Sequence, residues 1–284
     1  MAPHTSRPAM VAQNRARGRW WGMDALDALR LQLEWGADEA LAEAPIDRLA
    51  ARAAPAAPAR APQTSAPTPR PQPAPIPAAA AAAGPVQHAR DLADAAQTLA
   101  ELRAALEGFD GCPLSATATH LVFNDGNPAS GLMFVGEGPG AEEDRAGKPF
   151  VGPSGQLLDR MLGSIGLDRT QYLITNLIPW RPPGNRNPTD SEVMVCLPFL
   201  LRQIALVRPR HLVLVGALAA RAVLGGSTGI TKLRGKWAQA SIPGLPAPVP
   251  ALPMLHPAYL LRNPGAKRDA WADMLLLRRT LDEI

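Results

Sequence analysis

The chain has only two cysteines, Cys112 and Cys196, and no C-x-x-C pair. Two cysteines so far apart in sequence provide neither a disulfide framework nor a complete metal site, and a reducing compartment is their default setting. No run of 18 apolar residues is present, and no apolar segment follows the N-terminal arginines. We therefore expect a cytoplasmic protein without a membrane span, a secretory signal or a membrane partner.

A strong excess of charge of one sign is also missing. The formal net charge is +4, and nine of the 29 basic and seven of the 25 acidic residues lie in residues 1–86. Residues 87–284 therefore carry a net charge of only +2. If this part of the chain binds nucleic acid, it must do so through a local basic patch.

Large apolar residues are scarce in residues 46–86, where Ala, Pro, Arg, Gln, Thr and Ser dominate. This composition predicts a disordered, partly polyproline-II linker. The linker follows residues 1–45, in which Met23 to Ala44 form a predicted amphipathic helix. Residues 87–284 remain for one globular domain, which is long enough to bury a single core.

Strand-like and helix-like segments alternate in this domain. The strand-like apolar runs are Leu132–Val135, Tyr172–Thr175, Leu212–Val215 and Leu252–Leu255. The helix-like stretches are Asp91–Leu106, Gly155–Gly166, Asp190–Val207, Ala217–Leu224 and Arg268–Leu281. The alternation predicts an α/β fold, a three-layer sandwich with a mostly parallel four-stranded central sheet flanked by helices.

Polar residues follow three of the predicted strands: Glu137, Asn176 and His256. Ligands of open parallel sheets bind outside the carboxyl ends of the strands, so we expect these three side chains to converge. Glu137 lies in the loop Gly136-Glu-Gly-Pro-Gly140, which does not match the dinucleotide-binding G-x-G-x-x-G pattern. Phe150 lies on a loop between proline and glycine residues, where its ring is available for stacking.

These residues belong to six motifs that occur in one order along the chain. The motifs are Gly136–Gly140 with Glu143-Asp144, Gly147–Gly152, Ile174–Asn176, Arg181–Arg186, Arg234–Trp237 and His256–Arg262. Together they resemble the family 4 uracil-DNA glycosylases, and the resemblance extends from about Cys112 to the C-terminus. It implies the glycosylase fold and a DNA repair enzyme that flips uracil out of DNA and cleaves its N-glycosidic bond.

The resemblance also implies roles for the site residues. Phe150 would stack on the extruded base, Gly138 would line the pocket, and Asn176 would distinguish uracil from cytosine through its amide. His256 would donate to uracil O2 as negative charge develops there. Glu137 or Glu143 would position the attacking water, and the sequence leaves the choice open.

Uracil-containing DNA is the expected partner of a monomeric enzyme. After His256, the resemblance implies an apolar wedge with a neighbouring cation. The residues predicted to contact DNA are Tyr259, Leu260, Leu261 and Arg262, with Lys148, Arg186 and Arg234 on other motif loops. The N-terminal helix is a candidate site for a protein partner.

One departure from the family concerns its iron–sulfur cluster, which four cysteines normally bind. Cys112 and Cys196 match two of the four positions, whereas Ser115 and Trp180 occupy the others. Two thiolates do not provide the four ligands of a [4Fe–4S] cluster. We therefore expect no cofactor and no metal, with Trp180 filling much of the cluster volume and Cys112 lying near Cys196.

Two alternatives to the enzyme remain. The first is a catalytically weak or inactive relative that binds uracil-containing DNA. Covalent uracil-trapping relatives carry an extra basic loop that ends in His, and Lys232–Trp237 contains no His, which argues against trapping. The second is an interaction module attached to a repair or replication complex.

Overall fold

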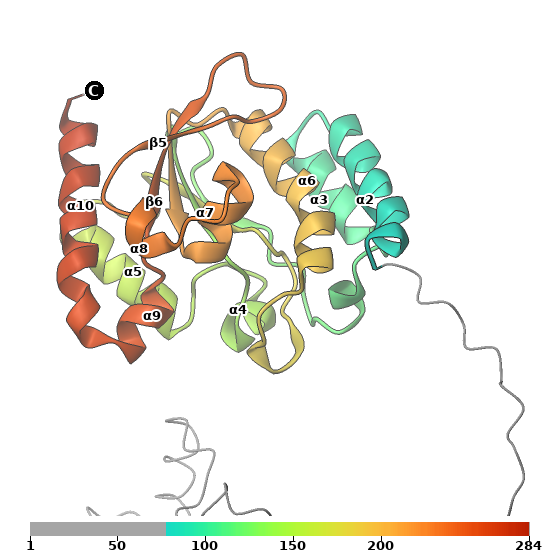
Figure 1. Cartoon of the computed structure of the whole chain (residues 1–284), viewed down its shortest axis with the longest axis horizontal. Helices are drawn as coiled ribbons and strands as arrows, with labels where there is room; N and C mark the ends of the chain where they lie inside the picture. Colours follow the sequence, from blue (N-terminus) through green and yellow to red (C-terminus); the bar gives the residue numbers. More distant parts are fainter. Residues whose placement is uncertain (1–77, 284) are drawn as a thin grey trace, which may run out of the picture. The chain divides into compact units, whose positions relative to one another are not determined.

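A mixed six-stranded sheet forms the centre of the computed structural model, which describes residues 78–283 (Figure 1). The predicted helix at Met23–Ala44 and most of the predicted linker lie outside the described residues. None of the helices between residues 78 and 283 is long and apolar enough to cross a membrane.

The four predicted strands form the parallel centre of this sheet. They are β2 (Leu132–Gly136), β3 (Leu173–Asn176), β4 (His211–Val215) and β6 (Val249–Met254). Two short antiparallel strands that the sequence analysis missed extend the edges: β1 (Asn124–Gly126) beside β3 and β5 (Ala238–Ala240) beside β6. The order is β1-β3-β2-β4-β6-β5, so the sheet is wider than the predicted four strands.

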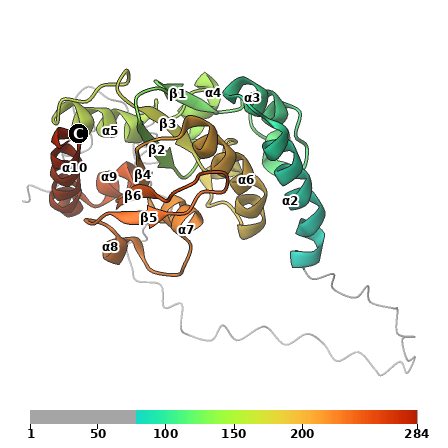
Figure 2. The same cartoon turned by 90° about the horizontal axis from the view of Figure 1, so that it is seen from above.

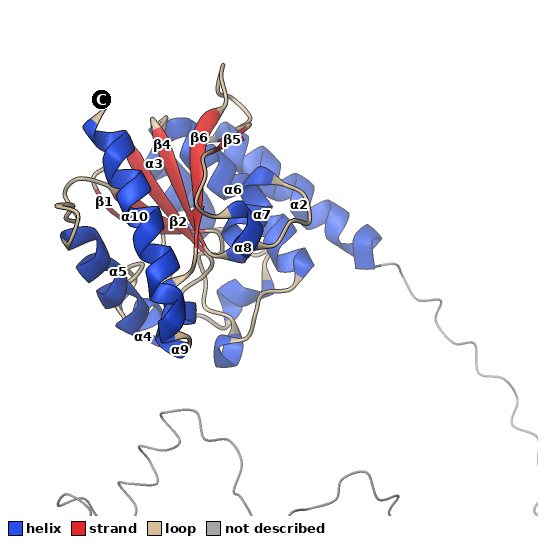
Figure 3. Ribbon diagram, turned by 60° about the vertical axis from the view of Figure 1, so that its left-hand side comes forward, coloured by secondary structure: helices blue, strands red, loops and turns tan. Residues whose placement is uncertain are grey.

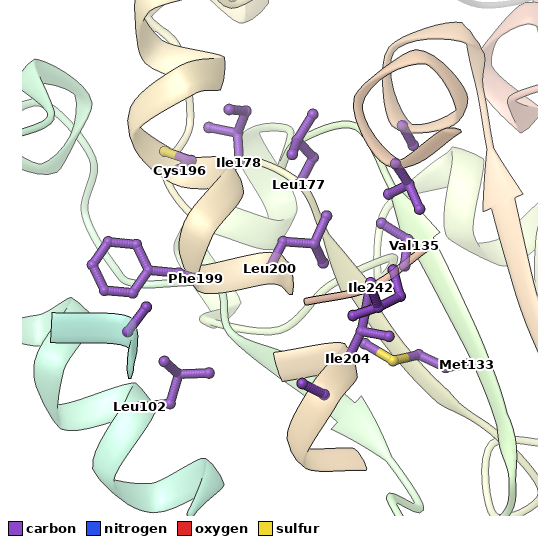
Figure 4. Close-up of a cluster of buried hydrophobic side chains, with 14 of the residues drawn as sticks. Leu102, Met133, Val135, Leu177, Ile178, Cys196, Phe199, Leu200, Ile204 and Ile242 are labelled. Atoms are coloured by element: carbon purple, nitrogen blue, oxygen red, sulfur yellow. The ribbon is translucent and has the colours of Figure 1, made fainter. Parts of the chain in front are cut away.

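Helices cover both faces of the sheet, which confirms the predicted three-layer sandwich (Figures 2 and 3). On one face, α6 (Asp190–Val207) and α7 (Ala217–Leu224) pack on alternate strand residues such as Met133 and Val135 (Figure 4). On the other face, α5 (Pro153–Gly163) and α10 (Lys267–Asp282) pack on the intervening residues, including Phe134. Both faces of the central strands are therefore buried, as their continuous apolar runs indicate.

The predicted helix Asp91–Leu106 is wrong as a single element. Helix α2 spans Ala78–Ala95, and α3 begins at Leu99 and ends at Glu107. The break forms at Thr98, whose side chain caps α3 by accepting a hydrogen bond from the Glu101 N–H. The first nine residues of α2 lie within the predicted linker, because its alanine run has high helix propensity.

Shorter helices fill the connections. They are α4 (Ala141–Ala146), α8 (Ile230–Leu233), α9 (Pro257–Arg262) and the 3-10 turns η1 (Pro113–Ala116), η2 (Pro183–Asn185) and η3 (Pro264–Ala266). From β2 the chain crosses to β3 on one side and then to β4 on the other side of β2. This reversal opens a crevice between the loops that follow β2 and β4, which is where open α/β sheets bind ligands.

Candidate active site

A cavity of about 710 Å³ lies at the carboxyl ends of the parallel strands. The loops after β2, β3, β4 and β6 all contribute to its wall. The structure brings Glu137, Asn176 and His256 together there, with Phe150 beside them. Residues up to 119 positions apart in sequence therefore share one site because the strands that carry them run parallel.

Glu137 spans the crevice between the two strand ends. Its Oε1 atom accepts a hydrogen bond of 2.9 Å from the backbone N–H of Leu218, in the first turn of α7. A helix N-terminus carries a partial positive charge and stabilises a nearby carboxylate. Glu137 is thus held between the ends of β2 and β4, and it lines the cavity.

Glu143 occupies a different position, on α4. Its Oε2 accepts from the Gly140 N–H at 3.0 Å, and its Oε1 accepts from the Gly152 N–H at 2.7 Å. Both carboxylate oxygens therefore accept hydrogen bonds from backbone N–H groups. They link the loop after β2 to the loop that carries Phe150. The side chain is buried and also contributes to the cavity wall.

Asn176 and the Phe150 ring meet over Gly136. A Cβ atom on Gly136 would lie 2.4 Å from Asn176 Oδ1 and 2.5 Å from the Phe150 ring, so only glycine fits there. Within residues 84–283, the buried Oδ1 atom of Asn176 has no hydrogen-bond partner. This oxygen is therefore available to accept a hydrogen bond from a ligand in the cavity.

His256 caps the N-terminus of α9. Its Nδ1 accepts a hydrogen bond of 3.1 Å from the Ala258 N–H, and its ring stacks on that of Phe150 with the centroids 5.8 Å apart. Burial lowers the pKa of His256, and the Glu137 carboxylate opposes this shift. The imidazole is therefore neutral near pH 7, with Nδ1 as acceptor and Nε2 as the donor.

The predicted DNA-contacting residues divide into two groups. Tyr259 and Arg262 line the cavity at its rim, and Leu261 is exposed next to them. Leu260 is fully buried and packs with Leu157, so its predicted place in the wedge is wrong. Tyr259 and Leu261 are exposed on α9, whereas Leu260 between them lies on the face of the helix that is buried in the core.

Three predicted DNA-binding cations have carboxylate neighbours. Arg186 lines the cavity and makes a bidentate ion pair with Glu192 at 2.7 and 2.9 Å. Arg234 makes a bidentate pair with the fully buried Asp273 at 2.8 and 2.9 Å. Lys148 lies 3.6 Å from a carboxylate oxygen of Asp125. Neither Lys148 nor Arg234 belongs to the cavity wall.

The remnant cysteine positions do not fit an iron–sulfur cluster. Cys196 donates a hydrogen bond to Cys112 with 3.9 Å between the sulfur atoms, and this lowers the pKa of Cys112. Ser115 donates its hydroxyl to the Cys112 carbonyl, and the buried Trp180 packs in the same core. Among residues 78–283 no group of three or more His, Cys, Asp and Glu side chains is arranged to hold a metal ion.

Several parts of the wall were not expected from the sequence. Four of these residues lie between β3 and α6 and two lie on α8: Pro182, Asn185, Asn187 and Pro188, and Ile230 and Thr231. The Leu218 N–H was also missed, because a backbone donor carries no signature in the sequence. The Arg181–Arg186 motif was a signal for the first group, since a run of Pro, Gly and Asn predicts an ordered turn rather than a strand or helix.

Fold and cavity together define an α/β protein with a polar cavity at the carboxyl ends of its parallel strands. Comparison with known proteins agrees with this class. Residues 123–275 match the uracil DNA glycosylase superfamily. A type-4 uracil-DNA glycosylase of Pyrobaculum aerophilum is 36% identical over 182 residues, which are 63% of this chain and 92% of the relative.

Two further relatives are similar. A type-4 uracil-DNA glycosylase of Thermotoga maritima is 41% identical over 54% of this chain and 77% of its own length. One of Archaeoglobus fulgidus is 39% identical over 57% of this chain and 82% of its own length. The chain therefore belongs to the uracil-DNA glycosylase superfamily and, within it, to the type-4 uracil-DNA glycosylases.

Proposed function

We propose that this chain removes uracil from DNA by hydrolysing the N-glycosidic bond, which leaves an abasic site. The observation that carries the proposal is the unsatisfied Asn176 amide oxygen, which lies with the Phe150 ring over Gly136, the residue before Glu137. The type-4 relatives bear the name of this activity.

Uracil fits the polar atoms of this site. The Asn176 amide accepts from uracil N3–H through its orphaned oxygen and donates to uracil O4 through its nitrogen. Cytosine has an acceptor at N3 and a donor at N4, so it mismatches both atoms. Extruding the base costs a few kcal/mol, and stacking on Phe150 returns about 1–3 kcal/mol of it.

Bond cleavage leaves positive charge on the sugar and negative charge on the departing uracil. The neutral His256 donates from Nε2 to uracil O2, where the negative charge develops, and so stabilises the transition state more than the bound substrate. Glu137 holds the water that attacks C1′ and stabilises the cationic sugar. Glu143 acts through the backbone, since both of its oxygens already accept hydrogen bonds.

The DNA strand runs over the rim of the cavity. Tyr259 and Leu261 are exposed by 41% and 43%, and they fill the gap that the extruded nucleotide leaves in the stack. Arg262 is next to them and binds a phosphate. Arg186 and Arg234 hold the motif loops in place through their ion pairs.

The enzyme works without an iron–sulfur cluster. Two of the four ligand positions are Ser115 and Trp180, and the two remaining cysteines share a hydrogen bond, so four thiolate ligands are not present at these positions. Protein purified without added metal should contain neither iron nor acid-labile sulfide. About four of each per chain would overturn this part of the proposal.

The N-terminal 77 residues serve a protein partner and not the reaction. Because α2 begins at Ala78 and its Ala89 and Ala93 are buried in the core, a cut before residue 78 leaves the enzyme intact. A variant that lacks residues 1–77 should release uracil at the rate of the full chain. A large loss of rate would assign these residues to catalysis.

One assay tests the main proposal. The full chain is incubated with a single-uracil oligonucleotide and with its cytosine counterpart, and abasic sites are then cleaved with alkali. We expect strand cleavage with uracil only, and much slower cleavage by the His256→Ser variant. Tight binding of the uracil strand without cleavage would instead identify an inactive DNA-binding relative.

A further inference from the structure

The backbone of Phe150 has an unusual conformation. Its φ angle is 56°, in the left-handed region that bulky residues avoid. Such a conformation persists only where the surrounding structure holds it, and it is found most often at functional sites. The stacking ring is therefore presented by a strained residue, and some part of the protein must hold that residue.

Two features hold the main chain at this point. Gly155 in α5 packs against it so closely that a Cβ atom there would lie 1.9 Å from the Phe150 carbonyl oxygen. Arg169 donates from Nη2 to the Phe150 carbonyl at 2.6 Å and from Nη1 to the Pro149 carbonyl at 3.3 Å. One guanidinium thus binds two successive carbonyls of the strained loop.

Arg169 is itself held firmly. It donates from Nε and Nη2 to the two oxygens of Asp159 at 2.8 and 3.2 Å, and its Nη1 lies 3.5 Å from Asp125. Its guanidinium carbon lies 6.0 Å from the centre of the Tyr172 ring. A planar group with five donors can make all these contacts at once, whereas a lysine ammonium cannot. Arg169 is not part of the cavity wall.

We propose that Arg169 is a positioning residue that fixes the Phe150 ring in the orientation needed to stack on the extruded base. The inference rests on the proposed function, because it assigns Arg169 a role in base recognition. Without the guanidinium, the two carbonyls lose their donor and Phe150 relaxes toward ordinary backbone angles. Its ring then turns away from Gly136 and no longer faces the base.

A double-mutant cycle tests this role. Arg169→Ala should lower kcat/KM on a uracil oligonucleotide by about ten- to a hundredfold, as misplacement of a binding group does. In the Phe150→Ala background, the same substitution should change kcat/KM by no more than about twofold, because no ring remains to be positioned. An equal loss in both backgrounds would overturn the proposal.

Further variants separate positioning from folding. Arg160→Ala removes an exposed arginine of the same helix as Asp159 and should leave kcat/KM unchanged. Arg169→Lys keeps the charge without the fork, so it should lose nearly as much as Arg169→Ala, and it replaces that variant in the cycle if Arg169→Ala does not fold. Methylguanidinium should restore activity to Arg169→Ala only where Phe150 is present, and rescue in both backgrounds would contradict the role.

The same cycle can be measured as affinity for free uracil by calorimetry. Arg169→Ala should weaken uracil binding in the wild-type background and not in the Phe150→Ala background. If the wild-type chain releases no uracil from DNA, the proposed function fails, while the binding measurement still tests whether Arg169 positions Phe150. If the wild-type chain is active and both cycles are additive, only the role of Arg169 fails.

Discussion

Nδ1 of His256 accepts a hydrogen bond from the backbone N–H of Ala258 at 3.1 Å. One contact therefore has two consequences. It caps α9, and it forces the proton of the neutral imidazole onto Nε2, the nitrogen left free to donate to a ligand. The nitrogen that His256 offers to a ligand is thus set by α9, the helix that also carries the rim residues Tyr259 and Arg262.

Replacing His256 with serine separates these two consequences. Serine is a good N-cap, so the free energy of unfolding of His256→Ser should lie within about 0.5 kcal/mol of the wild-type value. It cannot reach the base, so kcat should fall by about a hundred- to a thousandfold, as for loss of a transition-state donor. Denaturant unfolding and single-turnover excision measure the two effects, and a variant with near-normal kcat would remove His256 from the reaction.

The same histidine predicts how activity depends on pH. Burial lowers the pKa of His256 in the folded protein. The ring therefore stays neutral when the pH falls below about 6.5, the usual pKa of a histidine. The acidic limb of the kcat profile should therefore lie below that value. As the pH falls, His256 is protonated in the unfolded chain at a higher pH than in the folded protein. The contribution of His256 to stability is therefore present above about pH 6.5 and is lost as the pH falls through the pKa of the folded state. His256→Ser should reduce this acid sensitivity in unfolding experiments at pH 7 and pH 5.

Asn176→Asp tests base recognition. A carboxylate accepts but does not donate, so it loses the contact to uracil O4 and gains one to the cytosine amino group. Excision of uracil should fall by about five- to a hundredfold, as expected when a buried polar pair is broken, and the preference for uracil over cytosine should narrow. Rates on matched uracil and cytosine oligonucleotides measure both effects. Unchanged uracil excision would show that the base binds elsewhere.

Much of this site could be predicted because parallel strands place their ends together. Glu137, Asn176 and His256 each follow an apolar run, and the rule that ligands bind at strand ends was enough to predict their meeting. The strand before His256 was recognised only in part. Pro250 and Pro253 lie within β6, and proline normally argues against a central strand.

The ion pairs of the predicted DNA-binding arginines could not be read from the sequence, because they depend on side chains that meet only in the fold. Arg186 and Arg234 look like free cations in the motif loops, yet each is paired with a carboxylate on a helix, Glu192 on α6 and Asp273 on α10. Nothing in the spacing indicates these pairs. Leu260 was misjudged for a related reason, since a six-residue helix turns one of three successive large side chains inward.

Glu137 and Glu143 should differ in the property that each supports. Glu137→Gln keeps an oxygen for the Leu218 N–H and removes the charge, so it should lower the free energy of unfolding by no more than about 1 kcal/mol and kcat by about a hundredfold. Glu143→Ala leaves the N–H groups of Gly140 and Gly152 without their acceptor and should lower the free energy of unfolding by about 2 kcal/mol. Unfolding curves and kcat for both variants distinguish the roles. The opposite assignment follows if Glu143→Gln, which retains one acceptor oxygen, loses more kcat than Glu137→Gln.

Arg262 and Arg234 form a matched pair for DNA binding. Arg262 is exposed at the rim, so Arg262→Ala should weaken binding of any DNA sequence and reduce the salt dependence of log K by about one unit, as for one lost phosphate contact. Arg234→Ala leaves the buried Asp273 unpaired and should lower the free energy of unfolding by about 3 kcal/mol. Its effect on the salt dependence should be small. Fluorescence anisotropy over a range of salt concentrations and denaturant unfolding test both expectations. If Arg234→Ala reduces the salt slope as much as Arg262→Ala does and leaves stability intact, the ion pair opens to bind DNA and Arg234 contacts the backbone.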